Sequence, residues 1–316
     1  MRRRALIDIG SNTVKILIAE ISHSGQRKIL VQASLPCRLI PDFNQKKTNI
    51  PSESQTRLIA CINKFKKLII KWQVDDVRVV GTEAFRKAEN SDYVIQSILK
   101  ETGLRIEILS GSEEAQAVAE GLLNDPNLCD WKSFIALDLG GGSLELLTCK
   151  DRKTIELKSL PLGAIALAGR SGLDLAKPIP PETTLRLRKE VDQCLEEQAK
   201  VFKNSRLHLA GCGGTLVFLR QIIEESLQPL HPEEICFSGA EEIYNNIASL
   251  SLQERIANFP KLPADRADIF PYGLLVLLST MQFLGKDLLV HSFYNLRHGL
   301  VFNQSHQETT TQLRTK

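Results

Sequence analysis

Short apolar runs alternate with polar turns along most of this chain, and several of the runs end in glycine-rich loops. The stretch Phe134 to Leu147, FIALDLGGGSLELL, has the clearest pattern. Its first half has the apolar character of a buried strand and ends in Asp138 and three glycines, and a second apolar strand begins at Leu144. Because the second strand follows at once, the pattern predicts a hairpin rather than the strand, loop and long helix of a nucleotide-binding fingerprint.

The glycines between these strands favour an anion site. Residues without a Cβ let another molecule approach the backbone closely, and successive free N–H groups bind anions. Asp138 beside them supplies the oxygen ligand that Mg²⁺ prefers. We therefore predict that Asp138 binds a metal and that the following residues bind phosphate, namely Gly140, Gly141, Gly142 and Ser143.

A second copy of this hairpin lies near the N-terminus, in DIGSNTVKILI from Asp8 to Ile18. The two copies align Asp8 with Asp138, Gly10 with Gly140, Thr13 with Ser143, and Lys15 with Glu145. Such a repeat predicts two halves of similar fold that face one another, each with a phosphate-binding loop next to an aspartate.

Two further loops carry candidate chemistry. The strand at Val77–Val80 leads to Arg86, which would bind an oxyanion if it faces the site. A surface arginine at a helix start explains that spacing equally well. A strand at Arg105–Leu109 leads to SGSEEA, where Glu113 and Glu114 either serve the helix dipole or supply a catalytic base.

The second half continues in the same α/β manner. We expect helices at 181–202, 238–259 and 264–284, a polar loop at 41–49 and a polar tail at 305–316. A strand ending near Ala210 runs into a third glycine loop, in which Gly213 and Gly214 lie at a helix start suited to phosphate. The histidines His291 and His298 have no partner at metal-ligand spacing and are interpreted as structural.

Composition narrows the class of protein. With 316 residues and 43% hydrophobic content, the chain can form two domains. A net charge of +3 is too small to indicate nucleic-acid binding, and no apolar run is long enough for a membrane span. Seven scattered cysteines without metal-ligand spacing predict reduced thiols in a cytoplasmic protein.

Eight motifs together resemble the exopolyphosphatase and guanosine pentaphosphate phosphohydrolase family, Ppx/GppA, of the actin, Hsp70 and sugar-kinase superfold. They occur in the family's order from Asp8 to about Leu300, and they are DIGSNTVKILI, GTEAFRKAEN, SGSEEA, DLGGGSLEL, SLPLGA, GCGGT, RADIFPYG and LRHG.

The resemblance implies two ribonuclease-H-like, actin-like α/β domains, each a mixed five-stranded sheet flanked by helices, with the active site in the cleft between them. We expect domain I at 1–124, joined by the C-terminal segment 300–316, and domain II at 125–299. We expect a short two-domain form without the C-terminal helical domain of longer members, and therefore lower processivity or a preference for shorter substrates. Relatives are commonly dimers, so we expect a homodimer.

The resemblance also implies roles for individual residues. The family's catalytic glutamate falls on Glu114, which would activate water for attack on the terminal phosphate. Mg²⁺, or another divalent cation, would bind among Asp8, Asp138 and Glu145, with K⁺ as a monovalent activator. Phosphate would be bound by Gly10, Ser11, Asn12, Thr13, Lys15, Arg86, Gly140, Gly141, Gly142, Ser143, Gly213 and Gly214.

Two positions depart from the family pattern, and the substrate stays open. Lys15 and Ala166 stand where many relatives carry arginine, which bears on phosphate affinity. We expect an exopolyphosphatase that releases the terminal orthophosphate of inorganic polyphosphate. The alternatives are a guanosine pentaphosphate (pppGpp) 5′-γ-phosphohydrolase, an ATP-dependent kinase or ATPase, and a non-catalytic polyphosphate or nucleotide sensor.

Overall fold

The computed structural model describes residues 1–39, 48–227, 231 and 233–303. The chain divides into two compact units. Unit 1 comprises Met1–Asn124 and the segment from Tyr294 onward, and unit 2 comprises Asp125–Phe293. The polar loop predicted at 41–49 lies mostly outside the described residues, and the tail predicted at 305–316 lies wholly outside them.

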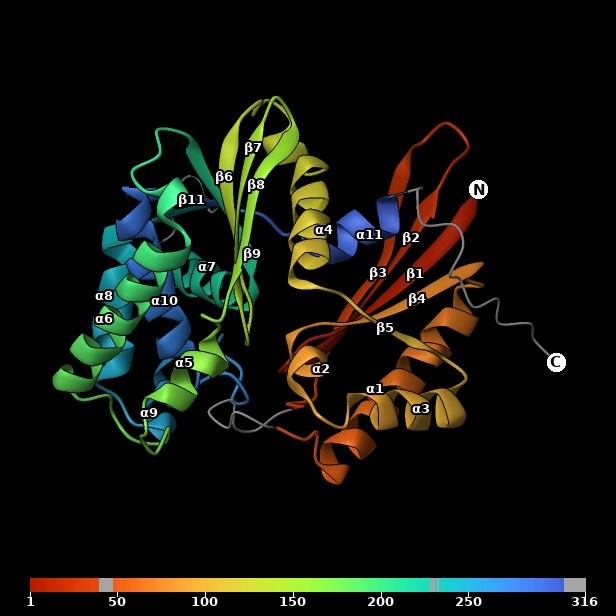
Figure 1. Cartoon of the computed structure of the whole chain (residues 1–316), viewed down its shortest axis with the longest axis horizontal. Coiled ribbons are helices and arrows are strands. Elements are labelled where there is room, and N and C mark those ends of the chain that lie inside the picture. Colours follow the sequence, from red (N-terminus) through yellow and green to blue (C-terminus); the bar gives the residue numbers. More distant parts are fainter. Residues whose placement is uncertain (40–47, 228–230, 232, 304–316) are drawn as a thin grey trace. The chain divides into compact units, whose positions relative to one another are not determined.

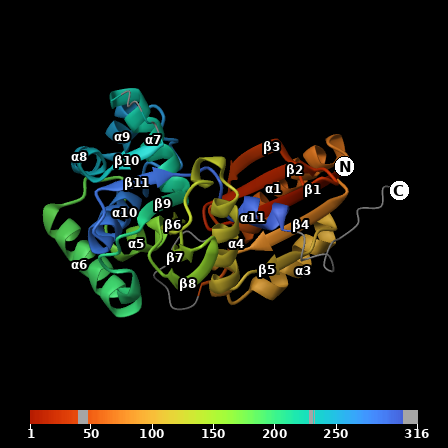
Figure 2. The same ribbon diagram turned by 90° about the horizontal axis from the view of Figure 1, so that it is seen from above.

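Unit 1 contains a five-stranded mixed sheet with the order β3-β2-β1-β4-β5, which is visible in Figure 2. The first three strands form an antiparallel meander, and β1, β4 and β5 pair in parallel. The continuous apolar run of β1 is explained by burial on both faces. The strands are β1 (Arg2–Ile9), β2 (Thr13–Ile21), β3 (Arg27–Pro36), β4 (Asp76–Gly81) and β5 (Ile106–Ile108).

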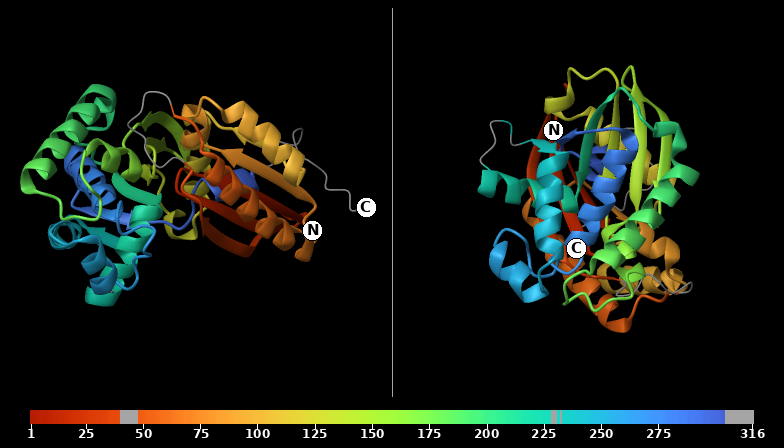
Figure 3. Two further views of the ribbon diagram at one scale, coloured as in Figure 1. Left: turned by 90° about the horizontal axis from the view of Figure 1, so that it is seen from below. Right: turned by 90° about the vertical axis from the view of Figure 1, so that its left-hand side faces the viewer.

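Helices cover both faces of this sheet. One face carries α1 and α3, seen along the sheet in the left panel of Figure 3, and the other carries α4 and α11 (Figure 1). The apolar stripe of α1, including Leu58, Ile62 and Phe65, is buried as its helical period predicts. The helices are α1 (Ser52–Lys71), α2 (Glu83–Lys87), α3 (Ser91–Thr102), α4 (Gly111–Leu123) and α11 (Leu296–Phe302).

Unit 2 contains a six-stranded sheet with the order β10-β11-β9-β6-β7-β8. We predicted five strands; the sixth is the short β10, which pairs antiparallel with β11 at the sheet edge. Its three residues are too few to give a readable alternation. The strands are β6 (Phe134–Leu139), β7 (Leu144–Lys150), β8 (Lys153–Leu160), β9 (His208–Gly213), β10 (Glu234–Cys236) and β11 (Leu288–His291).

The helices of unit 2 gather around α10, which packs against α5, α6, α7 and α8. The right panel of Figure 3 shows α10 in blue between the cyan and green helices. A helix apolar on all sides belongs in such an interior position. The helices are α5 (Ala164–Arg170), α6 (Pro181–Gln198), α7 (Gly214–Leu227), α8 (Phe237–Ala248), α9 (Leu252–Asn258) and α10 (Phe270–Leu284), with 3₁₀ turns η1 (Pro126–Leu128) and η2 (Lys200–Phe202).

Three of the predicted helices have different limits. The helix expected at 238–259 is two helices, because Ser251 forms a capping box with Glu254 and starts α9. The helix expected from residue 264 begins at Phe270, where Pro271 suits the first turn. The helix expected to reach residue 202 ends at Gln198 and is followed by η2.

Among the described residues, no helix is both long and apolar enough to cross a membrane.

Candidate active site

The two glycine hairpins have the same local geometry, each within its own unit. In unit 1, Asp8 lies opposite Lys15 on neighbouring strands, and the Gly10 N–H donates to the Thr13 carbonyl at 3.0 Å. In unit 2, Asp138 lies opposite Glu145, and the Gly140 N–H donates to the Ser143 carbonyl at 3.0 Å. The internal repeat predicted from the sequence is therefore confirmed.

The repeat extends into the third strand of each unit, whose residues the sequence analysis did not align with each other. Lys15 lies opposite Ser34 in unit 1, and Glu145 lies opposite Ser159 in unit 2. The signal was present in the sequence as SLPCRLI, starting at Ser34, and SLPLGAI, starting at Ser159. In unit 2 the Ser159 hydroxyl donates to Glu145 Oε1 at 2.8 Å and so fixes a carboxylate that is only 1% exposed.

The segment after this third strand holds the hairpin loop in place. In unit 1 the N–H groups of Cys37 and Arg38 donate to the Asn12 carbonyl, at 2.9 and 3.0 Å. In unit 2 the N–H groups of Ile165 and Ala166 donate to the Gly141 carbonyl, at 2.8 and 3.1 Å. In both loops a backbone carbonyl therefore accepts hydrogen bonds from the segment after the third strand, and these bonds hold the loop backbone in place.

Unit 2 brings its acids beside the third glycine loop. β6 and β9 run in parallel with Asp138 opposite Cys212. A Cβ built on Gly213 would lie 2.8 Å from Asp138 Oδ1, and the φ of +113° at Gly213 also requires glycine. The loops that contain Gly140–Gly142 and Gly213–Gly214 therefore lie side by side at the ends of neighbouring strands.

Unit 1 brings Arg86 and Glu114 into direct contact. Arg86 follows β4 and Glu114 follows β5, and these parallel neighbours end together with Gly81 opposite Ile108. Arg86 Nη1 donates to Glu114 Oε2 at 2.8 Å and to the Leu109 carbonyl at 2.8 Å. The Arg86 side chain is 20% exposed and is held by these contacts, so it does not extend freely into solvent.

The two glutamates at the start of α4 have separate roles. Glu113 Oε2 accepts from the Ser110 N–H at 2.8 Å and from the Ser110 hydroxyl at 2.7 Å, which completes a capping box. Glu114, the next residue, points to Arg86 and is 9% exposed. The helix-terminus role therefore belongs to Glu113.

Glu83 is a member of this cluster that the sequence analysis missed. Its carboxylate accepts from Arg86 Nη2 at 2.8 Å and pairs with Lys87 at 2.9 Å. Burial raises the pKa of Glu83, but the pairing with Lys87 and Arg86 outweighs burial and leaves the pKa below its usual value. Burial likewise opposes the charge of Arg86, yet Glu114 and Glu83 raise its pKa. The i, i+3 spacing from Glu83 to Arg86 was the available signal.

The residues predicted as metal ligands do not form a cluster within either unit, so the metal site stays a prediction. The described residues contain no group of three or more His, Cys, Asp or Glu that would hold a metal ion. The predicted ligands divide between the units, with Asp8 in unit 1 and the opposed pair Asp138 and Glu145 in unit 2. The two histidines interpreted as structural, His291 and His298, are each at most 1% exposed.

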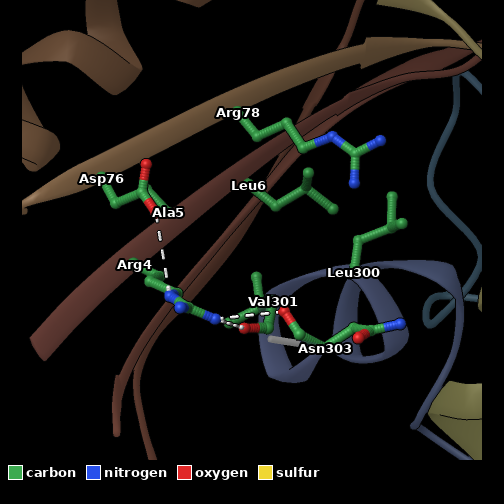
Figure 4. Close-up of a pocket in the computed structure, with 8 residues that line it drawn as sticks. All are labelled: Arg4, Ala5, Leu6, Asp76, Arg78, Leu300, Val301 and Asn303. Carbon is green, nitrogen blue, oxygen red and sulfur yellow. Dashed lines mark hydrogen bonds and ion pairs between the residues drawn. The ribbon is translucent and has the colours of Figure 1, made fainter. Parts of the chain in front are cut away.

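A small cavity of about 30 Å³ in unit 1 contains none of the predicted site residues (Figure 4). Arg4 crosses it, with Nη1 donating to the Asn303 carbonyl at 3.1 Å and Nε lying 3.8 Å from Asp76. Such a volume suits a water molecule. The cavity belongs to the packing of α11 on the sheet, not to the candidate site.

Comparison with solved structures identifies the fold class. The chain superimposes on an exopolyphosphatase from Cytophaga hutchinsonii with a TM-score of 0.86 and 22% identity, covering 95% of this chain and 97% of that one. It superimposes on the Aquifex aeolicus Ppx-GppA enzyme with a TM-score of 0.77 and 24% identity, covering 95% and 99%. The expected actin-like fold, with two mixed sheets flanked by helices, is confirmed.

Sequence comparison gives the family. A model of the Ppx/GppA phosphatase family matches residues 17–308, and the chain belongs to this family. It is 25% identical to exopolyphosphatase 1 of Mycobacterium leprae over 97% of this chain and 90% of that protein. It is 26% identical to a bifunctional 3-dehydroquinate synthase/phosphatase of Fusobacterium nucleatum over 92% of this chain, which spans only 44% of that longer protein.

Proposed function

We propose that this protein is a divalent-metal-dependent exopolyphosphatase, which hydrolyses the terminal phosphoanhydride bond of inorganic polyphosphate in the cytoplasm and acts as a homodimer. The family membership and the similarity to the mycobacterial exopolyphosphatase support the reaction class. Seven cysteines without a disulfide are compatible with a reducing compartment.

The observation that carries the proposal is the contact between Glu114 and Arg86. The Glu114 carboxylate accepts a hydrogen bond from Arg86 Nη1 at 2.8 Å, and it would accept the proton of a water molecule that attacks phosphorus. Arg86 also carries positive charge to the point where the transferring phosphate would gain negative charge. Because Glu83 and the Leu109 carbonyl also hold Arg86, this charge is positioned before the substrate arrives.

The residues proposed as metal ligands suit Mg²⁺. Asp138 and Glu145 offer hard oxygen ligands from adjacent strands, and Mg²⁺ in phosphate-binding sites needs only one or two carboxylates in addition to substrate oxygens and water. Asp8 is the corresponding acid of the first hairpin. When bound, the ion would neutralise phosphate charge. The glycine-loop N–H groups and Arg86 would orient the terminal phosphate.

Replacing the base tests the mechanism directly. We expect Glu114→Gln to lower phosphate release from polyphosphate by about 10³-fold or more, because the amide cannot accept the water proton. Polyphosphate binding, measured by calorimetry, should persist. Glu113→Gln is the matched control, since Glu113 caps the helix and should affect stability more than turnover. Full activity of Glu114→Gln would refute the assignment.

The substrate requires a parallel comparison. Phosphate release should be measured on short polyphosphate, long polyphosphate, guanosine pentaphosphate and ATP at one salt concentration, because polyanion binding depends on salt. We expect the highest kcat/KM on polyphosphate. A higher value on guanosine pentaphosphate would reassign the substrate, turnover of ATP alone would indicate a kinase-like ATPase, and tight binding without hydrolysis would indicate a sensor.

A further inference from the structure

A hydroxyl group of β8 contacts the buried carboxylate of Glu145. Ser159 lies opposite Glu145 in the register of β7 and β8, and its hydroxyl donates to Glu145 Oε1 at 2.8 Å. Glu145 is 1% exposed, so this bond replaces part of the hydration that an ionised carboxylate loses on burial. The roles proposed above use Glu145 as a metal ligand but give Ser159 no function.

The strand register places Ser159 in a row of polar side chains on one face of the sheet. Asp138 of β6 lies opposite Glu145, and Glu145 lies opposite Ser159, so the three share a face. Two carboxylates on directly opposed residues repel each other, and a divalent cation would relieve that repulsion. Because β7 lies between β6 and β8, the Ser159 hydroxyl holds Glu145 from the side away from Asp138.

The segment after β8 fixes the position of Ser159. β8 ends one residue after Ser159, and the chain then returns to the second glycine hairpin. There the Gly163 N–H donates to the Gly142 carbonyl at 3.2 Å, and the Ala164 N–H donates to the Gly140 carbonyl at 3.1 Å. Ser159 is thus held between its pairing with β7 and the loop predicted to bind phosphate. A hydroxyl with a fixed position can in turn fix the orientation of the carboxylate that it contacts.

We propose that Ser159 is a positioning residue for the divalent cation, and that it acts by holding Glu145 in the orientation that binds the ion. Loss of a hydrogen-bonded neighbour of a metal ligand weakens metal binding by about 10- to 100-fold. The proposal rests on the proposed function, because it takes Asp138 and Glu145 as ligands of the ion. It adds a residue that sets the affinity for the metal through one of those ligands.

The first glycine hairpin provides a matched control. Ser34 occupies the equivalent position on β3, opposite Lys15. The Lys15 ammonium group carries only hydrogen-bond donors and cannot bind a cation, so Ser34 has no metal ligand to orient. Ser34→Ala therefore removes the same hydroxyl group from the same place in the repeat while Asp138 and Glu145 keep their surroundings.

Binding of Mn²⁺ alone tests the proposal without substrate or turnover, since carboxylates bind Mn²⁺ as they bind Mg²⁺. Electron paramagnetic resonance should give Ser159→Ala a Kd for Mn²⁺ about 10- to 100-fold above that of the wild type. Ser159→Thr keeps the hydroxyl group and should bind Mn²⁺ nearly as the wild type does, as should Ser34→Ala. Equal affinity of Ser159→Ala and the wild type would overturn the proposal.

A double variant tests whether Ser159 acts through Glu145. Glu145→Gln alone should weaken Mn²⁺ binding, and Ser159→Ala in addition should weaken it little further, because the hydroxyl group then has no carboxylate to orient. If the two losses of affinity multiply, Ser159 acts independently of Glu145 and the proposal is wrong. Melting curves in EDTA identify a variant that does not fold. Should Ser159→Ala be one, Ser159→Cys, a weaker donor of similar size, carries the same expectation of weakened binding.

Phosphate release separates positioning from a general loss of stability. In Ser159→Ala the Mg²⁺ concentration for half-maximal turnover of polyphosphate should rise about 10- to 100-fold, while kcat at saturating Mg²⁺ stays close to the wild type. A reduced kcat that no Mg²⁺ concentration restores would overturn the proposal. If the wild type binds Mn²⁺ but hydrolyses no substrate, the proposed function fails while the Mn²⁺ affinities still decide the role of Ser159. If the wild type binds no Mn²⁺, the metal ligands and the role of Ser159 are both wrong.

Discussion

At the scale of single residues, the candidate site is a set of mutually balancing charges. Arg86 and Lys87 are the cations, and Glu83 and Glu114 are the anions. Burying one such charge would be costly, but each finds a partner at 2.8 to 2.9 Å. The arginine that was expected to bind phosphate is therefore held by carboxylates before any substrate arrives.

We expect Glu83→Gln to destabilise unit 1 by ~1–3 kcal/mol at pH 7, because Arg86 and Lys87 lose a charged partner. The folded-state pKa of Glu83 lies below 4.5, its unfolded value, so its stabilisation is complete above pH 4.5 and is lost as pH falls through the folded pKa. Thermal melts at pH 7 and pH 3.5 should therefore differ less in the variant than in the wild type. Glu101→Gln, at an exposed position on α3, is the control. Equal acid sensitivity of both proteins would contradict the ion-pair account.

His291 allows a second prediction at this scale. It is 1% exposed, neither ring nitrogen has a partner among the described residues, and burial, with the charge of Arg220, lowers its pKa to about 3. Because the unfolded value is 6.5, the neutral ring favours the fold above pH 6.5, and this contribution is lost as pH falls toward 3.

His291→Leu should therefore leave Tm unchanged or raised at pH 8, since it removes a buried polar group without a partner. At pH 5 the Tm of the leucine variant should exceed that of the wild type by more than it does at pH 8. Melting curves at both values test this, and a loss of stability at pH 5 would mean that the ring makes hydrogen bonds.

At the scale of elements, close backbone contact joins the C-terminal helix to unit 1. α4 and α11 cross at Gly121 and Gly299. A Cβ built on Gly299 would lie 1.9 Å from the Ala117 carbonyl oxygen, and one built on Gly121 would lie 2.1 Å from that of Asn295. These contacts attach α11 to unit 1, which includes the segment from Tyr294 onward.

We expect Gly299→Ala to destabilise the protein by ~1–3 kcal/mol or more, because the new methyl group must displace backbone atoms. The urea midpoint should fall, and hydrogen exchange should increase in α11 before it increases in β6 or β9. The exposed Gln116→Ala on α4 is the control. Unchanged exchange in α11 would show that the two helices can separate without cost.

At the scale of the whole molecule, the matched hairpins raise the question of whether both serve one reaction. That both do so is a prediction from the repeat and the family resemblance. We expect Asp8→Asn and Asp138→Asn each to lower kcat/KM by about 10²-fold. The double variant should be little worse than the poorer single variant, since residues that act as a unit are not additive.

Magnesium titration of each variant should accompany these rates, with Asp92→Asn on the exposed side of α3 as the control. If the fold-reduction in kcat/KM of the double variant equals the product of the two single reductions, the two acids act independently. Normal activity of either single variant would remove that hairpin from the site.

The sequence predicted features that depend on neighbouring residues better than features that depend on residues distant along the chain. The strands around Asp8 and Asp138 were readable because apolar runs and glycine turns are local signals. The limits of α8, α9 and α10 were missed because capping by Ser251 and the first-turn position of Pro271 interrupt continuous apolar patterns. The β10 strand was missed because it depends on pairing with β11.

The sequence by itself thus determined two α/β units, each with a glycine hairpin that carries an aspartate at the end of its first strand. Strand period and turn chemistry depend on residues that are adjacent in the sequence. Only the tertiary structure decided which glutamate contacts Arg86. Glu114 lies 28 residues from Arg86, and the parallel register of β4 and β5 brings them together. Such contacts depend on strand pairing and helix packing, which no local pattern of residues specifies.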